Sequence, residues 1–161
     1  MIEAKKLISF LKKKNINFYT GVPDSILKEF CIIIDKFPEK NHVRAINEGS
    51  AVAIAAGYSM SKKKIPCVYL QNSGLGNAVN PLLSLADEQV MGIPMLMIIG
   101  WRGHPDEVDE PQHKKQGAIT ENLLKIMGID YLIIDDANFE YTKDIECLID
   151  NMRESRRPSA V

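Results

Sequence analysis

The fold of this chain is most constrained by short apolar runs that are separated by helical patterns. In two of these runs, 66–70 and 94–99, apolar residues follow one another without alternating with polar ones. A strand with one solvated face alternates in this way, whereas a strand covered on both faces does not. Amphipathic patterns fill the stretches between the runs. The sequence therefore predicts an α/β fold, with a parallel β-sheet sandwiched between helices.

The predicted elements alternate along the whole chain. Helices are expected at 2–14, 26–34, 51–57, 77–85, 119–127 and 141–152. Strands are expected at 18–22, 43–46, 66–70, 94–99 and 131–134. Asp24 or Ser25 is expected to cap the second helix, and Asn77 to open the fourth. The polar residues 100–117 are expected to form a long loop.

Residues 1–161 form one predicted domain, since no repeat, low-complexity tract or interdomain linker interrupts the pattern. The segment from Arg157 to Val161 resembles a strand that is just beginning. We therefore expect the chain to be part of a longer protein.

Composition argues against several classes of function. The formal net charge is −1, from 20 basic and 21 acidic residues, so no basic excess exists to bind nucleic acid. The longest apolar stretch, 93–99, is too short to span a membrane, and the N-terminus lacks the features of a signal peptide. The three cysteines fit neither a disulfide framework nor a metal motif. Cys31 and Cys67 lie in apolar runs, which predicts buried reduced thiols and a cytoplasmic protein.

Four segments rich in glycine or polar side chains directly follow predicted strands. They are Gly21-Val22-Pro23-Asp24-Ser25, Asn47-Glu48-Gly49, Gln71-Asn72-Ser73-Gly74-Leu75-Gly76-Asn77 and Gly100-Trp101-Arg102-Gly103-His104. Ligands of parallel α/β sheets bind outside the carboxyl ends of the strands. The four segments therefore predict a binding site at this edge of the sheet.

Glu48 follows a strand and precedes a helix of small apolar residues, so we expect it to be partly buried. Its position alone favours an acid that complements the helix dipole, which is commoner than a catalytic acid. Gly74-Leu75-Gly76 resembles a phosphate loop, but Val79 stands where a third glycine is required. A nucleotide site is thus excluded. The loop is either a permissive turn or a backbone surface against a flat ligand.

His104, His113 and Arg102 lie among several carboxylates in the polar loop, at no standard zinc spacing. Two interpretations fit them: solvated side chains, or a lid over an anionic substrate. Trp101 directly follows a buried strand and is expected to serve in packing.

In their order and spacing, these motifs resemble the pyrimidine-binding domain of thiamine-diphosphate enzymes. The matching residues are Gly21-Val22-Pro23, Asn47-Glu48-Gly49 with Ala55-Ala56-Gly57-Tyr58, and Asn72-Ser73-Gly74-Leu75-Gly76-Asn77. The resemblance covers nearly the whole chain and makes a catalytic role for Glu48 the favoured interpretation. In the family, a glutamate at this place hydrogen-bonds N1′ of the aminopyrimidine and helps the thiazolium carbon to lose its proton.

The resemblance also implies roles for the neighbouring residues. Asp24 and Ser25 are implied to lie near the reacting group, as catalytic residues beside Glu48. The implied cofactor contacts are Glu48, Asn72, Gly74, Gly76 and Asn77. The implied substrate contacts after the third strand are Gln71, Asn72 and Ser73.

Finer features are similar to the phosphonopyruvate and sulfopyruvate decarboxylase branch. Asp109-Glu110-Pro111-Gln112-His113, followed by Gln116-Gly117 and Thr120, resembles the phosphonopyruvate enzymes. A carboxy-lyase that converts 3-phosphonopyruvate to phosphonoacetaldehyde and CO2 is thereby implied. Arg102 and His113 are candidates for binding the phosphonate, because a multiply charged anion needs cationic partners. They fit equally well as ion pairs with Asp106 or Glu110.

The resemblance further implies a missing half. In the family, a second α/β domain with a Gly-Asp-Gly motif holds the diphosphate and Mg²⁺, and these 161 residues lack that motif. We therefore expect no metal ligands here and no activity without that domain or subunit. A half-domain should expose an apolar face, which predicts homo-oligomers. Two alternatives stay open: the alpha-type subunit of a sulfopyruvate decarboxylase, and a non-catalytic pairing domain of the same fold.

Overall fold

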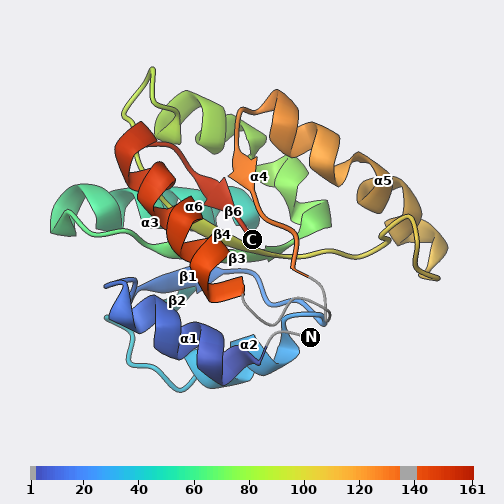
Figure 1. The fold of residues 1–161 in the computed structure, drawn as a ribbon, viewed down its shortest axis with the longest axis horizontal. Helices are drawn as coiled ribbons and strands as arrows, with labels where there is room; N and C mark the ends of the chain where they lie inside the picture. The colour runs from blue at the N-terminus through green and yellow to red at the C-terminus, as the bar shows by residue number, and fades with distance from the viewer. Residues whose placement is uncertain (1–2, 135–140) are drawn as a thin grey trace.

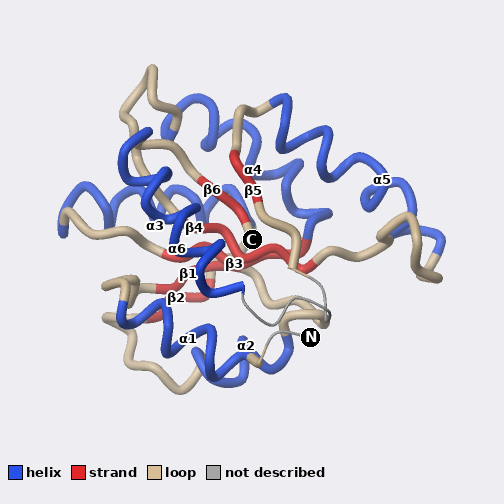
Figure 2. Tube along the Cα trace, viewed as in Figure 1, coloured by secondary structure: helices blue, strands red, loops and turns tan. Residues whose placement is uncertain are grey.

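A parallel sheet runs through the centre of the molecule (Figure 2). The computed structural model describes residues 3–134 and 141–161. Within them, six parallel strands form one sheet with the order β2-β1-β3-β4-β6-β5. The strands are β1 (Tyr19–Gly21), β2 (His42–Arg44), β3 (Cys67–Gln71), β4 (Leu96–Gly100), β5 (Asp130–Tyr131) and β6 (Ser159–Ala160). The predicted parallel sheet is confirmed.

Helices cover both faces of the sheet. They are α1 (Ala4–Lys13), α2 (Lys28–Ile34), α3 (Glu48–Lys62), α4 (Leu75–Pro81) with the π-helical turn η2 (Leu82–Ala86), α5 (Pro111–Ile126) and α6 (Tyr141–Ser155). Side chains of α1, α2 and α6 join one core, and those of α3, α4 and α5 join the other (Figure 1). The predicted sandwich is therefore confirmed. None of the helices in the described residues is long and apolar enough to cross a membrane.

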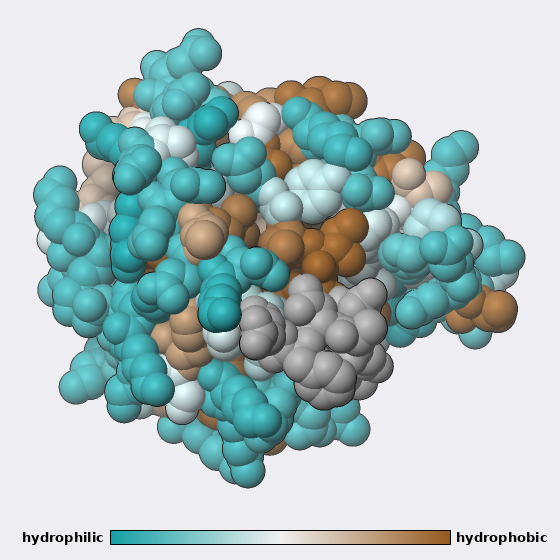
Figure 3. Space-filling view, viewed as in Figure 1, coloured by the Kyte–Doolittle hydropathy of each residue, from teal (hydrophilic) through white to brown (hydrophobic). Residues whose placement is uncertain are grey.

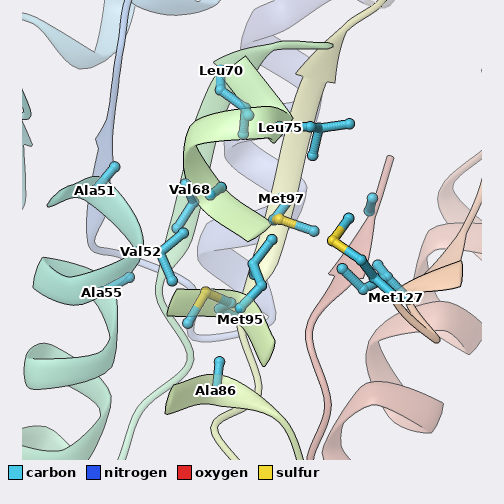
Figure 4. Close-up of a cluster of buried hydrophobic side chains, with 14 of the residues drawn as sticks. Ala51, Val52, Ala55, Val68, Leu70, Leu75, Ala86, Met95, Met97 and Met127 are labelled. Carbon is cyan, nitrogen blue, oxygen red and sulfur yellow. The ribbon is translucent and has the colours of Figure 1, made fainter. Parts of the chain in front are cut away.

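The core beneath α3 depends on small side chains. Ala51 and Val52 of α3 belong to the same buried cluster as Val68 of β3 and Met97 of β4 (Figure 4). Short side chains let the helix approach the sheet closely, as the apolar run predicts. On the other face, Cys31 and Cys67 are buried free thiols, also as predicted.

The carboxyl ends of β1 and β3 lie at a topological switch point. β1 pairs with β2 on one side and with β3 on the other. The chain leaves β1 toward α2 on one face and leaves β3 toward α4 on the opposite face. A crevice for ligands forms where neighbouring connections diverge in this way. Gly21 permits the close pairing, since a Cβ there would stand 1.9 Å from the backbone oxygen of Tyr69.

The predicted loop over 100–117 is wrong in its second half, because α5 begins at Pro111. Proline suits the first helical turn, where its missing N–H costs no hydrogen bond. The face that α5 buries here consists of Gly117 and Thr120 rather than large apolar residues. Apolar periodicity therefore cannot reveal these turns, and it predicts the helix only from Ile119 onward.

Two other helices begin away from their predicted positions. The predicted start at Asn77 is wrong, because a 3-10 turn, η1 (Asn72–Gly74), leads directly into α4. α2 begins at Lys28, later than a cap at Asp24 or Ser25 would place it. The first residue of the predicted helix 2–14 lies outside the described residues.

Candidate active site

Glu48 opens α3 with one carboxylate oxygen bonded and the other free. Asn47 caps the helix, and its Oδ1 accepts a hydrogen bond from Ser50 N at 2.8 Å. Glu48 is half-buried, and its Oε2 accepts a hydrogen bond from Asn77 Nδ2 at 2.8 Å. A Cβ on Gly74 would come within 2.3 Å of Oε1, so any side chain there would displace the carboxylate. Within the described parts of the chain, no group donates a hydrogen bond to Oε1.

Asp24 joins the loop after β1 to the segment after β3. It is buried, and its Oδ2 accepts hydrogen bonds from two backbone N–H groups of the following turn at 3.0 and 3.3 Å. Its Oδ1 accepts from Gln71 Nε2 at 2.6 Å, and Gln71 Oε1 accepts from Ser73 Oγ at 2.6 Å. A Cβ on Gly100 would lie 2.2 Å from Oδ2. This row of side chains bridges the switch point and ends one residue from Gly74.

Asn72 lies beneath this row and holds the backbone of Arg102. Its Oδ1 accepts from Arg102 N at 3.0 Å, and its Nδ2 donates to Arg102 O at 2.9 Å. Nδ2 also donates to Thr120 Oγ1 at 2.9 Å. Asn72 is only 2% exposed, and both of its amide protons are used. Its amide therefore serves as a clamp between β4's loop and α5.

Arg102 and His113 meet at the carboxylate of Asp109. Arg102 Nε donates to Asp109 Oδ2 at 2.8 Å, and its Nη2 donates to Oδ1. His113 Nδ1 lies 3.0 Å from Oδ1. Arg102 Nη1 also donates to Ser25 Oγ at 3.0 Å. The Arg102 and His113 hydrogen bonds hold the pKa of Asp109 well below its ordinary value, and Asp109 raises the pKa of the Arg102 guanidinium.

The loop that carries Asp109 rests on the first turns of α5 through two glycines. Gly103 has a φ of +69°, which favours glycine. A Cβ on Gly117 would lie 1.6 Å from the backbone oxygen of Gly103. Trp101 Nε1 donates to Gly117 O at 3.1 Å, so Trp101 combines packing with a hydrogen bond. Both glycines are required for the contact that places Asp109 beside Arg102.

A groove of about 710 Å³ opens beside Arg102. The described residues that line it include Ser25 and Arg102, but neither Glu48 nor Asn77. Most of the other lining side chains are apolar, and Figure 3 shows apolar residues gathered near the middle of one face of the molecule. The groove therefore borders the Arg102 end of the site.

The structure brings most of the predicted site residues to one edge of the sheet. These are Asp24, Ser25, Glu48, Gln71, Asn72, Ser73, Gly74, Asn77, Arg102 and His113. Gly76 differs, because it is exposed on α4 and a Cβ there would meet no atom within 4 Å. His104 packs instead against Trp101, with ring centroids 4.6 Å apart.

Asp109 and Thr120 belong to the segment that resembles the phosphonopyruvate enzymes, but the sequence assigns neither of them a role in the site. The suggested ion-pair partners Asp106 and Glu110 are wrong for Arg102, which pairs with Asp109. The four-residue spacing of Asp109 and His113 at a helix start is a local signal for their contact. No local signal links Thr120 to a residue 48 positions earlier.

A family model described as "Thiamine pyrophosphate enzyme, N-terminal TPP binding domain" matches residues 3–126. The chain belongs to this family. This TPP-binding chain is 37% identical over 140 residues to a phosphonopyruvate decarboxylase of Streptomyces viridochromogenes, covering 87% of the chain and 34% of the relative. It is 35% identical over 121 residues to sulfopyruvate decarboxylase subunit alpha of Methanothermobacter thermautotrophicus, covering 75% of the chain and 71% of the relative. The chain thus spans about a third of the length of this phosphonopyruvate decarboxylase.

Solved structures confirm the predicted fold of TPP-binding domains. Benzoylformate decarboxylase from Polynucleobacter necessarius superposes with a TM-score of 0.75 at 26% identity, over 99% of this chain and 29% of that one. A thiamine diphosphate-dependent 4-hydroxybenzoylformate decarboxylase of Rhodococcus jostii RHA1 gives 0.70 at 18% identity, over 98% and 29% of the two chains. The second likeness concerns the fold alone.

Proposed function

We propose that this chain is the pyrimidine-binding half of a thiamine-diphosphate-dependent decarboxylase that converts 3-phosphonopyruvate to phosphonoacetaldehyde and CO2. The observation that carries the proposal is the free carboxylate oxygen of Glu48, set against Gly74 at the carboxyl edge of the sheet. Two phosphonopyruvate decarboxylases support the substrate, since they are 37% and 35% identical over 87% and 84% of this chain.

The residues around Glu48 suit the aminopyrimidine of thiamine diphosphate. A flat heterocycle needs a few placed polar groups beside a surface that is clear of side chains. Glu48 Oε1 offers the acceptor, Gly74 makes room for the carboxylate of Glu48, and Asn77 fixes the other oxygen at 2.8 Å. When bound, the cofactor supplies a nucleophilic carbon and takes up the electron pair that CO2 leaves behind.

Glu48 is the proposed proton carrier. A carboxyl group can accept a hydrogen bond when ionised and donate one when protonated, so it can share a proton with N1′ of the aminopyrimidine. Asn77 occupies Oε2, which leaves Oε1 for this exchange. Glutamine at this position would keep a hydrogen bond but could not transfer the proton.

Asp24, Ser25, Gln71 and Ser73 are proposed to surround the reacting carbon. Asp24 and Gln71 are bonded at 2.6 Å across the switch point, so they form a fixed wall rather than two mobile side chains. Ser25 is exposed, and its hydroxyl is within reach of both this wall and Arg102. Such a wall would orient a 2-oxoacid that enters from the solvent side.

Arg102 and His113 are proposed to bind the phosphonate. A guanidinium has five N–H donors. Among the residues that the structure describes, Asp109 and Ser25 take three of them, which leaves two for an anion. His113 uses Nδ1 toward Asp109, which leaves Nε2. Guanidinium and imidazole donors are well suited to an oxyanion with several acceptor atoms.

The second half of the site is proposed to come from a diphosphate-binding domain or subunit, which would also hold Mg²⁺. Across 3–134 and 141–161, no three His, Cys, Asp or Glu side chains gather as a metal site. The sulfopyruvate relatives named subunit alpha support a partner chain, since this chain covers 71% of one of them. We further propose a homo-oligomer in the cytoplasm, where the buried thiols Cys31 and Cys67 would stay reduced.

Sulfopyruvate is the alternative substrate, and the 35% identity to a sulfopyruvate decarboxylase subunit favours it. Sulfonate carries one negative charge, whereas phosphonate carries up to two near neutral pH. A non-catalytic pairing domain is the remaining alternative, and the free oxygen of Glu48 argues against it.

The deciding experiment measures CO2 release from phosphonopyruvate and from sulfopyruvate. It uses the full-length gene product, or this chain with its partner subunit, with thiamine diphosphate and Mg²⁺. We expect cofactor-dependent turnover of phosphonopyruvate with the higher kcat/KM. A preference for sulfopyruvate would keep the reaction and change the substrate. No turnover of either compound by cofactor-loaded protein would contradict the proposed function.

A further inference from the structure

Arg102 is fixed more completely than binding alone requires. Asn72 pairs with its backbone N–H and C=O, at 3.0 and 2.9 Å, as a neighbouring strand would. Asp109 accepts from Nε and Nη2 along one edge of the guanidinium, and Ser25 accepts from Nη1. An arginine side chain normally loses considerable rotamer freedom when it binds a ligand. Here that freedom is already lost, so the cost of ordering Arg102 falls on folding rather than on binding.

Both carboxylate oxygens of Asp109 accept hydrogen bonds from neighbouring residues. Its carboxylate accepts from Arg102 Nε and Nη2 and from His113. It also accepts from the backbone N–H groups of Gly103 and Glu110 at 2.8 and 2.7 Å. Backbone donors cannot follow a moving side chain, so these two bonds tie the carboxylate to the loop. A carboxylate held in this way is a poor candidate for displacement by substrate.

We propose that Asp109 is a positioning residue that fixes Arg102, and through it the selection of 2-oxoacids with a second anionic group. The inference rests on the proposed function. Asp109 does not touch the substrate. It holds the guanidinium of Arg102 beside Ser25 at the groove that both residues line, with two N–H groups that no described residue accepts from. Replacement of Asp109 is expected to weaken the binding of an anionic substrate and to leave the rate of the chemical step nearly unchanged.

The test is a double-mutant cycle on the assembled enzyme, with steady-state kinetics on phosphonopyruvate. The variants are Asp109→Asn, Arg102→Gln and their combination. Asp109→Asn is expected to raise KM about 10-fold to 100-fold, the penalty for a misplaced binding group, and to change kcat less than about threefold. In the Arg102→Gln background, Asp109→Asn is expected to raise KM by a much smaller factor, because only its contact with His113 remains to be lost.

Asp106→Asn is the matched control, because it removes the same charge from the same loop. The Asp106 side chain is 92% exposed. The KM of the Asp106→Asn enzyme is therefore expected to equal that of the wild type. Thermal unfolding of each variant checks that the fold is intact. Equal KM increases from Asp109→Asn in both Arg102 backgrounds would overturn the proposal. A lower KM would also overturn it and would identify Asp109 as an internal competitor of the substrate.

Two outcomes separate this inference from the proposed function. If the enzyme prefers sulfopyruvate, the same cycle is run with that substrate. If neither compound turns over, the proposed function fails, and phenylglyoxal labelling of Arg102 with mass spectrometry replaces kinetics. Faster labelling of Arg102 in Asp109→Asn than in the wild type and Asp106→Asn supports positioning. An unchanged labelling rate overturns it.

Discussion

Two carboxylates at the same edge of the sheet have opposite surroundings. Among the described residues, Glu48 accepts one hydrogen bond, from Asn77, and its second oxygen faces a glycine. Asp109 accepts five, from Arg102, His113 and two backbone N–H groups. The pKa of Asp109 is held well below its ordinary value by these donors, with Arg102 the largest cause.

The difference shows how the same functional group, a carboxylate, can suit two different roles. A carboxylate whose acceptor sites are filled by its own chain holds neighbours in place, since a ligand would have to break existing bonds. A carboxylate with an unfilled oxygen can serve a ligand at no such cost. By this criterion, we propose that Glu48 takes part in the reaction and that Asp109 positions Arg102.

The largest expected effect is that of Glu48→Gln. Glutamine preserves the size and a hydrogen bond but cannot exchange a proton, and a positioned acid or base contributes about 10²-fold to 10⁴-fold. We expect kcat for CO2 release to fall by roughly this factor, with KM little changed. Glu39→Gln, the same substitution at an exposed glutamate far from the site, is the control. A Glu48→Gln enzyme within about threefold of the wild type would remove the distinction between the two carboxylates.

Gly74→Ala tests whether the free oxygen of Glu48 depends on the glycine. Gly74 has a φ of −75°, which alanine also adopts, so backbone strain is not involved. The added Cβ would lie 2.3 Å from Glu48 Oε1 and displace it. Overpacking of about 1–3 kcal/mol corresponds to roughly 10-fold to 100-fold weaker binding of thiamine diphosphate.

The matched control for Gly74→Ala is Gly57→Ala in α3. A Cβ on Gly57 would meet no atom within 4 Å, and alanine is the better helix former. We expect cofactor affinity to stay unchanged in this control, as measured by calorimetry on the assembled enzyme. Equal affinities for both variants would show that Gly74 does not protect Glu48.

Much of this fold is predictable because burial leaves a periodic trace. β3 and β4 are buried on both faces, so their apolar runs identify them without any tertiary information. Glu48 and Gly74 stand in short segments next to strands, but only the resemblance of those segments to thiamine-diphosphate enzymes favours a site role for them. These features depend on local sequence.

The parts that sequence does not reveal depend on contacts between distant segments. Asn72 and Thr120 are 48 residues apart, and neither residue type indicates the other. The first turns of α5 bury Gly117 against Gly103, so the helix has no apolar stripe at the place where it begins. The sequence places Asp109 in a segment that resembles the phosphonopyruvate enzymes, but its pairing with Arg102 depends on the fold.

Gly117→Ala breaks the Arg102 region while leaving Glu48 untouched. Alanine is favoured inside a helix, but its Cβ would lie 1.6 Å from the backbone oxygen of Gly103. The loop that carries Asp109 must then move. We expect KM for the anionic substrate to rise roughly 3-fold to 10-fold, with thiamine diphosphate affinity unchanged. A loss of cofactor affinity instead would show that the two regions are not independent.

The smallest expected effect is the pH dependence of stability. The pKa of Asp109 is lowered in the folded chain, so its contribution is present above the unfolded pKa and is lost as the pH falls below about 4. Burial lowers the pKa of His42, so the unfolded chain takes up a proton first and stability declines as the pH falls below about 6.5.

Urea unfolding of the assembled enzyme from pH 7 to pH 3 separates these two contributions. Asp109→Asn is expected to flatten the acidic part of the curve, and His42→Gln the part nearer neutrality. A curve that Asp109→Asn leaves unchanged would mean that the five hydrogen bonds of Asp109 do not stabilise its ionised form.

The contrast between the two carboxylates is tested most directly by kinetics of Glu48→Gln and Asp109→Asn side by side. Both variants replace a carboxylate with its amide in the same assembled enzyme, under the same cofactor and substrate concentrations. We expect Glu48→Gln to lower kcat and leave KM nearly unchanged, and Asp109→Asn to raise KM and leave kcat nearly unchanged. Matching changes in the two variants, or the reverse assignment, would contradict the account.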